Sequence, residues 1–415
     1  MDFMHKLFHK IRKLRTNENI LITIDILYNS KVSFMGIFLM AFMIGVSLKS
    51  SPVSFINMEL SNYAFCGILS IIMADILCTH PIASWRTGMI FSIIRIVAVI
   101  IIDPEFVFFP LIIGFLGALE SQLYWRPKTF LEVKEVSNSR RDRFSSLRQI
   151  LVEITKIVMP IILGIVISDA GYRRAANIIL AISVVQLLLS ILFRPTNKIK
   201  IKTHSLKDAL KYAVSHKNIR RVLWLQTLRG MVMTGCAYEI VTQLNIYSSN
   251  SSNVELGSYQ SIASLVAIAL LLLYCRFKTK ASTKSEAIIV ALLPAAVLLP
   301  VTAIIFPGNF IIAIVLFVYF RSVVQSLYSS TVFAVYHQDE LKKSVHDDVY
   351  RIEIDILSEL WLCVGRVISI IPLLLLVCLN RNDLILPLIA IQSRLIPLIL
   401  IIIRKCETSQ ASSRR

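Results

Sequence analysis

Charged residues are scarce in this sequence. They make up 17% of its 415 residues, whereas 56% are hydrophobic and the mean hydropathy is +0.70. Soluble domains usually carry about 25% charged residues, so this composition excludes an ordinary soluble enzyme or binding domain. Apolar runs of roughly 17–25 residues recur along the chain, which is the length that a helix needs to cross a bilayer. The composition therefore predicts an all-α integral membrane protein with many spans.

Motifs for nucleotide, zinc-dependent and serine hydrolysis are also missing. The chain has no Gly-x4-Gly-Lys-Ser/Thr loop, no His-Glu-x-x-His pattern and no Gly-x-Ser-x-Gly turn. We therefore predict that the protein is not an enzyme and uses no cofactor. The cysteines show no Cys-x-x-Cys spacing, and none pairs with a nearby histidine at the spacing of a metal site, which indicates neither a metal site nor a disulfide framework. Seven cysteines are scattered along the chain: Cys66, Cys78, Cys236, Cys275, Cys363, Cys378 and Cys406.

The net charge of +18 and the pI near 9.7 are also found in nucleic-acid-binding proteins. That interpretation is disfavoured here, because the basic residues concentrate in short segments between apolar runs. The basic N-terminus lacks the small-residue cleavage site of a secretory signal peptide, and Asp25 and Lys31 interrupt the apolar run that follows it. We therefore expect no nucleic-acid partner, and we expect this run to remain as the first transmembrane helix.

Apolar runs and the polar segments between them predict twelve transmembrane helices. Interrupting prolines are compatible with this assignment, because neighbouring helices can satisfy the carbonyls that proline leaves free. The predicted spans are 20–48, 60–79, 87–102, 106–124, 149–168, 175–193, 222–246, 256–275, 286–305, 310–336, 350–379 and 383–403.

Lysines and arginines are strongly biased toward one side of this predicted membrane. Thirty-three of the 44 fall in the two termini and in alternate loops, and the opposite loops hold only Lys49, Arg173, Arg174 and Arg381. Cytoplasmic loops carry the excess of positive charge in membrane proteins. The bias therefore predicts an even number of spans with both termini in the cytoplasm, in a multi-pass protein of the bacterial inner or plasma membrane.

The longest predicted cytoplasmic connection lies in the middle of the chain and divides the spans into two sets of six. Many secondary transporters share this plan of two repeated halves. The predicted organisation is a basic N-terminal tail at 1–19, a six-helix bundle at 20–193, a cytoplasmic central loop at 194–221, a second six-helix bundle at 222–403 and a C-terminal tail at 404–415.

Three segments carry motifs that point to a known family: residues 143–150, Arg-Phe-Ser-Ser-Leu-Arg-Gln-Ile; Glu359 followed by Gly365-Arg366; and residues 256–261. They resemble the major facilitator superfamily, specifically its macrolide- and siderophore-exporter branch. The first resembles the polar entry to helix five in that branch, the second a carboxylate and a Gly-Arg pair of these exporters, and the third the start of their helix eight. The resemblance implies two six-helix bundles, a central cavity, export by alternating access with proton coupling, and a monomer.

Other motifs of that superfamily are only partly present. Ala74-Asp75 survives from the helix 2–3 loop, where the family's aspartate latches the two halves on the cytoplasmic side. The Gly-Pro motif of helix five is reduced to Pro160 and Gly164, and span four lacks the arginine of many proton-coupled drug exporters. The resemblance makes Asp75 a candidate latch, and Pro160 and Gly164 the remnant of the exporter motif.

Ionic residues within the predicted spans are the candidate transport residues. A charge at the bilayer centre costs at least about 2.5–3.5 kcal/mol, so such residues usually face the interior and have partners. In span eleven the helical spacing places Asp355, Glu359 and Arg366 on one face, with Glu359 and Arg366 about 10 Å apart along the helix. Arg229 and Glu239 share a face of span seven. These residues either line a cavity between the bundles or form structural ion pairs.

Asp25 in the first span is a further candidate, because helix one lines the cavity in the family that the chain resembles. An interfacial structural role for Asp25 is the alternative. Glu153 and Lys156, at i and i+3, are expected to pair within their own helix.

The leading hypothesis is a secondary active exporter of a small molecule such as a drug, antibiotic, peptide or siderophore-like compound. Its partners would be that substrate, the lipid bilayer and protons, exchanged at Glu239 or Glu359. A carboxyl group removed from water holds a proton more readily, which suits this role. Two alternatives stay open: a flippase for lipid-linked sugars, and a membrane partner or sensor that keeps the transporter fold without transporting.

Overall fold

The computed structural model describes residues 16–39, 42–43, 53–136, 138–194, 206–233, 253–278, 298–319, 351–396, 398–399 and 401–402. All regular secondary structure in this part of the chain is helical, which confirms the all-α class. Five of the described helical stretches are long and apolar enough to cross a membrane: Thr16–Phe38, Val53–Ile72, Pro81–Ile101, Leu147–Leu192 and Glu353–Cys378. The count of twelve crossings and the side on which the termini lie stay predictions.

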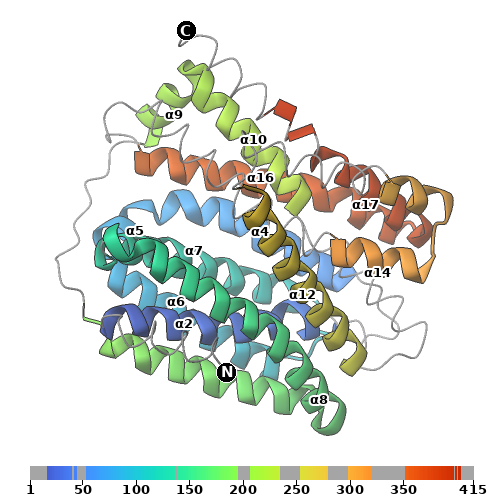
Figure 1. Cartoon of the computed structure of the whole chain (residues 1–415), viewed down its shortest axis with the longest axis horizontal. Coiled ribbons are helices and arrows are strands. Elements are labelled where there is room, and N and C mark those ends of the chain that lie inside the picture. Colours follow the sequence, from blue (N-terminus) through green and yellow to red (C-terminus); the bar gives the residue numbers. More distant parts are fainter. Residues whose placement is uncertain are drawn as a thin grey trace.

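The N-terminal half, residues 16–194, is a bundle of long helices that lie side by side (Figure 1). The helix pairs α6–α7, α4–α7 and α2–α8 make its main contacts. Its elements are α2 (Thr16–Ser33), continued by the π-helical turn η1 (Phe34–Phe38), then α4 (Val53–Ile72), α5 (Ala74–Thr79), α6 (Pro81–Ile101), α7 (Phe109–Glu135) and α8 (Asn138–Leu192).

Helix α8 contains two of the predicted spans. Its apolar stretch Leu147–Leu192 has 46 residues, about 70 Å of helix, which is more than twice the thickness of the hydrocarbon core. The stretch is broken at Gly171, whose φ of 79° lies in the left-handed region that glycine adopts without steric cost. The chain turns back there, so that each arm can cross the membrane once (Figure 1).

Several helices are longer than the sequence predicts. Helix α4 begins at Val53 rather than at 60, α7 runs to Glu135 rather than to 124, and α8 begins at Asn138 rather than at 149. The predicted cytoplasmic loop 125–148 is therefore mostly helical. The predicted spans ended at the charged residues of this segment, because the prediction used apolar content alone. Several of these charged side chains have ionic partners inside the bundle, and these partners allow the helix to continue through them.

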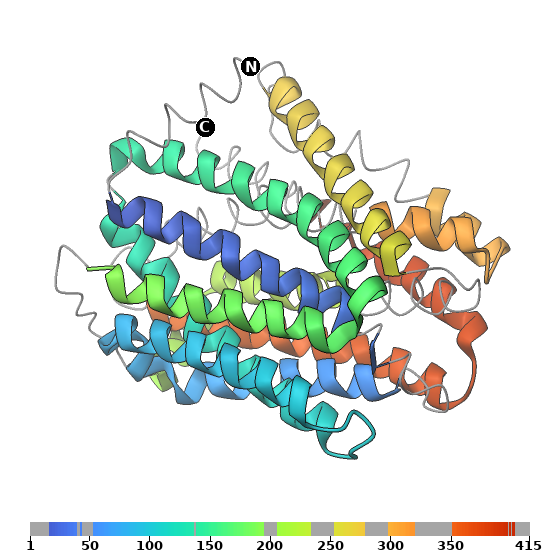
Figure 2. The same cartoon turned by 90° about the horizontal axis from the view of Figure 1, so that it is seen from below.

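The C-terminal half, residues 206–402, begins with a short helix inside the segment predicted as the central loop. This helix buries Ala209 and Ala213 against its neighbours. The described elements of this half, seen from a second side in Figure 2, are α9 (Leu206–Ser215), α10 (Lys217–Met233), α12 (Asn253–Lys278), a helical segment at 298–305, α14 (Phe310–Tyr319), α16 (Arg351–Cys378), the 3-10 turn η4 (Asn382–Leu384) and α17 (Ile385–Ser393).

Among the residues that the structure describes, the two halves make their most extensive contacts along α4 with α16 and α8 with α12. The second pair approaches closely enough for backbones to touch: a Cβ atom on Gly257 would lie 2.4 Å from the carbonyl oxygen of Pro160. Ser261 of α12 also donates a hydrogen bond of 2.6 Å to the carbonyl of Ile157 on α8. Small residues at helix crossings allow this approach in membranes, where packing rather than the hydrophobic effect holds helices together.

Candidate functional site

A polar cavity of about 290 Å³ lies between the two halves. Its walls come from α5 and α7 of the N-terminal half and from α10 and α16 of the C-terminal half. The lining residues are Ala74, Leu77, Trp125, Arg126, Thr129, Phe130, Gln226, Arg229, Asp355, Ile356, Ser358 and Glu359.

Three of the candidates predicted from the sequence line this cavity together. Asp355 and Glu359, one helical turn apart on α16, both face it, and Arg229 of α10 stands on the same wall. Asp355 is exposed and Glu359 is half-buried, so water in the cavity reaches both carboxylates. Arg229 donates a hydrogen bond of 3.4 Å to the side-chain oxygen of Gln226.

Arg126 brings a second positive charge from the opposite half. Its guanidinium donates a hydrogen bond of 3.5 Å to the carbonyl of Ile356, which links α7 to α16 across the cavity. The lining thus carries two guanidinium groups and two carboxylates in one small volume. A site of this kind can bind a ligand that itself carries both charges, because each ligand charge then finds an opposite partner.

Close packing of α10 against α16 fixes the wall that carries Arg229 and Glu359. A Cβ atom on Gly365 would lie 2.0 Å from the carbonyl oxygen of Thr227, and one on Gly230 would lie 2.2 Å from that of Leu362. Any larger side chain at either glycine would force the two helices apart. Gly365, the glycine of the Gly-Arg pair, is therefore required for the close packing of α10 against α16.

Arg366 does not line the cavity. Its guanidinium lies 4.9 Å from the centre of the Tyr63 ring on α4, a cation–π contact between the two halves. It also interacts electrostatically with Glu359 on its own helix and with Glu59 on α4. Arg366 is therefore a half-buried neighbour of the cavity that joins α16 to α4.

Asp25 is held in an ionic network inside the N-terminal half. Lys128 of α7 lies 2.5 Å from its carboxylate, Arg148 of α8 lies at 3.8 Å, and the Tyr124 hydroxyl donates a hydrogen bond of 3.3 Å. Both oxygens of Glu132 accept bonds of 2.7 Å from Arg148. Asp25 is not among the residues that line the cavity, and its place favours the structural interpretation over the transport one.

A second ionic network lies deeper in the same half. Lys31 of α2 pairs with Glu120 of α7 and donates a hydrogen bond of 2.6 Å to Ser92 of α6. Arg95 of α6 reaches the other oxygen of Glu120 at 3.4 Å. Gly117 provides the space for Arg95, since a Cβ atom there would lie 2.8 Å from the guanidinium carbon.

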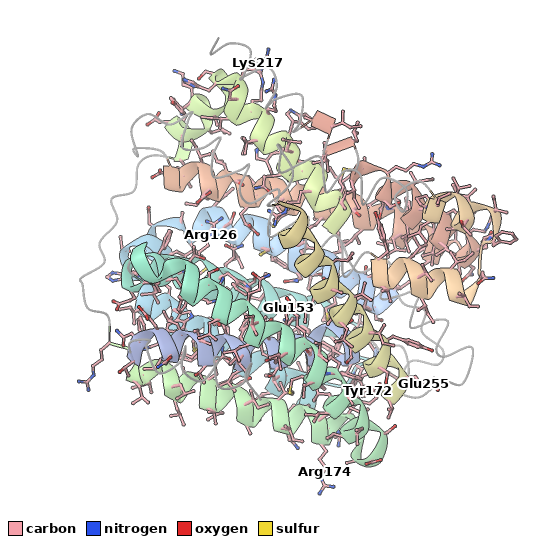
Figure 3. All side chains as sticks on the ribbon, viewed as in Figure 1. Arg126, Glu153, Tyr172, Arg174, Lys217 and Glu255 are labelled. Carbon is pink, nitrogen blue, oxygen red and sulfur yellow. The ribbon has the colours of Figure 1, made fainter. Side chains whose placement is uncertain are left out.

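The remaining motif residues lie outside the cavity. Asp75 is exposed in the first turn of α5, and Arg86 donates its hydrogen bonds to the carbonyls of Ser190 and Phe193 at the end of α8. Pro160 and Gly164 both pack against the first turns of α12: a Cβ atom on Gly164 would lie 2.8 Å from the carbonyl oxygen of Asn253. Tyr172 also donates a bond to the Asn253 side chain, at 2.8 Å, near the point where Figure 3 shows Tyr172 and Glu255.

Glu239 lies outside the described residues. The expected pair of Glu153 and Lys156 is present at 2.8 Å. Arg126 and Glu59 were not predicted from the sequence, because Arg126 falls in a predicted loop and Glu59 falls before the predicted second span. A signal for the longer α7 was available: Lys128 and Glu132 stand at i and i+4, the spacing of an ion pair within a helix, and they lie 3.3 Å apart.

Solved structures of transporters share this fold. A bacterial homologue of the iron transporter ferroportin, in its inward-facing state, superposes with a TM-score of 0.67 at 15% sequence identity, over 94% of this chain and 99% of that one. A POT family transporter in complex with 5-aminolevulinic acid gives a TM-score of 0.64 at 12% identity, over 93% of this chain and 95% of that one. No protein-family profile and no curated protein sequence matches this chain. At these identities the likeness shows that this chain shares the fold of those transporters, and it shows the fold alone.

Proposed function

We propose that this chain is a secondary active transporter that exports a small charged molecule by alternating access. The observation that carries the proposal is the polar cavity between the two halves, lined by charged groups from both of them. In transporters of this type the substrate site lies at the interface of the repeats, and the repeats rock around it. The most extensive contacts between the halves in the described part of the chain, α4–α16 and α8–α12, are the surfaces on which such rocking would occur.

The chemistry of the cavity supports a zwitterionic substrate. Arg126 and Arg229 suit a carboxylate or phosphate group, and Asp355 and Glu359 suit an ammonium group. The volume of about 290 Å³ is at the lower end of ligand pockets, which favours an amino-acid-like compound or a short peptide over a large macrolide. The POT family neighbours were solved with 5-aminolevulinic acid and with a thioalcohol-conjugated peptide, and both are small molecules of this size class.

Proton exchange at Glu359 is the proposed source of energy for export. Glu359 is half-buried, water from the cavity reaches it, and Arg366 supplies a nearby positive charge. A proton and a cationic substrate group would therefore compete for the same carboxylate. The sequence candidate Glu239 is a second carboxylate for the same role.

Reconstituted vesicles provide the test. Purified protein in liposomes with an imposed pH gradient should move labelled dipeptides or amino-acid-like zwitterions against their concentration gradient. Glu359→Gln should abolish the pH-driven movement and retain exchange of substrate down its gradient, because the cavity keeps its shape while the proton site is lost. Asp383→Asn is the matched control, since Asp383 is an exposed carboxylate outside the cavity.

Full pH-driven transport by Glu359→Gln would contradict the proton-coupling role. Absence of any uptake or exchange across a panel of zwitterions, cations and anions, by a protein that elutes as a single folded species, would contradict the transporter proposal itself. The sign of the gradient that drives movement decides between export and import.

A further inference from the structure

Two thiols and a carboxylate meet at the contact between α4 and α16. The sulfur atoms of Cys66 and Cys363 and a carboxylate oxygen of Glu359 all lie within 4.8 Å of one another. Both cysteines are buried, and both are free thiols. Cys66 belongs to the N-terminal half and the other two residues to the C-terminal half, so the cluster exists only when the two halves are packed together.

The helix packing around this cluster holds the two sulfur atoms close. A Cβ atom on Gly67, next to Cys66, would lie 3.3 Å from the Cβ atom of Cys363, so the helices meet at this point with little space between them. The side-chain amide of Gln122 on α7 donates a hydrogen bond of 2.9 Å to the sulfur of Cys66. Such outer contacts orient metal ligands and tune their affinity in known metal sites.

The charges of this cluster and its surroundings are matched to a divalent cation. Two thiolates and one carboxylate would carry three negative charges, and Arg366, which interacts electrostatically with all three groups, carries one positive charge. Glu59, the other carboxylate near Arg366, interacts more strongly with Arg95. A divalent ion would bring the sum to zero. A buried cluster with balanced charge avoids the large cost of an uncompensated ion away from water.

We propose that Cys66, Glu359 and Cys363 form a binding site for a thiophilic divalent metal ion, with Zn²⁺ as the representative, that bridges the two halves. Thiolate ligands select soft or borderline ions such as zinc over magnesium and calcium, which prefer all-oxygen sites. Ligands about 2.0–2.3 Å from a tetrahedral zinc ion lie roughly 3.3–3.8 Å apart. The three ligand atoms of the cluster all lie within 4.8 Å of one another, and three protein ligands leave a fourth position for water.

The cavity supplies the route to this site. Glu359 is both a ligand of the proposed metal site and a lining residue of the cavity, and Cys363 follows it one helical turn further along α16. An ion that enters the cavity therefore meets Glu359 first and the thiols behind it. A metal bound there would tie α4 to α16 and would hold the two halves together along this contact.

Metal binding by the full-length protein in detergent micelles, kept under a non-thiol reductant, provides the test. Co²⁺ serves as the spectroscopic probe, because thiolate–cobalt bonds produce charge-transfer absorption in the near ultraviolet. We expect one Co²⁺ per chain, displaced by Zn²⁺ but not by excess Mg²⁺ or Ca²⁺. Cys66→Ser and Cys363→Ser should each remove the charge-transfer band and weaken Zn²⁺ binding at least about 100-fold, beyond the roughly 10–100-fold that outer partners contribute.

Cys378→Ser is the matched control, because Cys378 is an exposed free cysteine at the end of α16 and lies outside the cluster. It should keep the absorption band and the affinity of the unmodified protein. Equal Zn²⁺ binding by Cys66→Ser and the unmodified protein would overturn the proposal, and so would displacement of Co²⁺ by Mg²⁺.

A second measurement needs no variant. Saturating Zn²⁺ should raise the thermal unfolding midpoint of the unmodified protein, since the ion binds only the folded arrangement. An unchanged midpoint would overturn the proposal even if the serine variants fail to fold. These experiments do not depend on the proposed transport activity: a protein inactive in vesicles could still bind the metal, and an active transporter could still fail to bind it.

Discussion

The ionic networks of the N-terminal half and the cavity between the halves contain the same kinds of residues in opposite situations. In the networks, Lys31 and Glu120 have side chains only 3% and 4% exposed, and each charged group has an ionic partner on another helix. In the cavity, Asp355 is exposed and Glu359 is half-buried. Both sets of charges lie on apolar helices, and only one set remains open to a ligand.

This difference separates charged residues that affect the stability of the fold from charged residues that affect ligand binding. A buried pair contributes little net stability, yet removal of one partner leaves an uncompensated charge and is strongly destabilising. A cavity carboxylate is already hydrated, so its removal costs the fold little and changes what the cavity binds. Substitutions in the two regions should therefore separate loss of folding from loss of transport.

The largest effect is expected in the networks. Glu120→Gln removes the carboxylate that Lys31 and Arg95 share, and should lower the free energy of unfolding by about 3–5 kcal/mol, measured as a fall in the thermal midpoint and in the yield of monodisperse protein. Glu153→Gln is the matched control in the same half, because its partner Lys156 is 35% exposed and stays hydrated. If Glu120→Gln melts like the unmodified protein but no longer transports, the network belongs to the transport path and the comparison fails.

An intermediate effect is expected at the glycines that position each region. Gly365→Ala places a Cβ atom against the backbone carbonyl of Thr227, which cannot move alone, so the variant should lose about 1–3 kcal/mol. Gly117→Ala meets only the end of the Arg95 side chain, which can rotate away, so its loss should stay within about 1 kcal/mol. Thermal unfolding of both variants measures the difference, and equal midpoints would show that α10 and α16 can separate without cost.

The smallest effect is expected at the exposed pair of Arg381 and Asp383. Arg381 donates two hydrogen bonds of 3.1 Å that hold the pKa of Asp383 below its usual range. A lowered pKa in the folded state adds stability above the ordinary aspartate pKa, and this stability is lost as the pH falls through the folded value. Both groups are hydrated, so Asp383→Asn should leave the unfolding midpoint unchanged at neutral and mildly acidic pH. A measurable shift in either condition would show that this turn is coupled to the membrane helices.

Helical spacing was sufficient to find one side of the cavity. Asp355 and Glu359 share a face of α16 because residues four apart lie one above the other, and the structure places both on the cavity wall. Arg229 was found in the same way. Helical spacing alone could not predict the surroundings of Asp25. Its position in the first span resembles that of a cavity residue. Its ionic partners Lys128 and Arg148, however, come from a segment that was predicted to be a loop.

The proposed metal cluster could not be found from the sequence for a related reason. Cys66 and Cys363 belong to different halves, and no local spacing connects them. Glu59 and Arg126 were missed because polar residues end a hydropathy-based span, although a helix continues through them when its charges have partners.

The sequence by itself was sufficient to predict that the protein lies in a lipid bilayer, that it is all-α, and on which helix faces its charged residues lie. Each of these depends on composition and on the fixed geometry of a helix, which is a local property. The tertiary structure decided which charges pair, which face the cavity and which thiols meet. Those outcomes depend on which helix lies next to which, and in lipid that choice depends on close packing and on the satisfaction of buried charges, because apolar faces alone are equally well solvated by lipid.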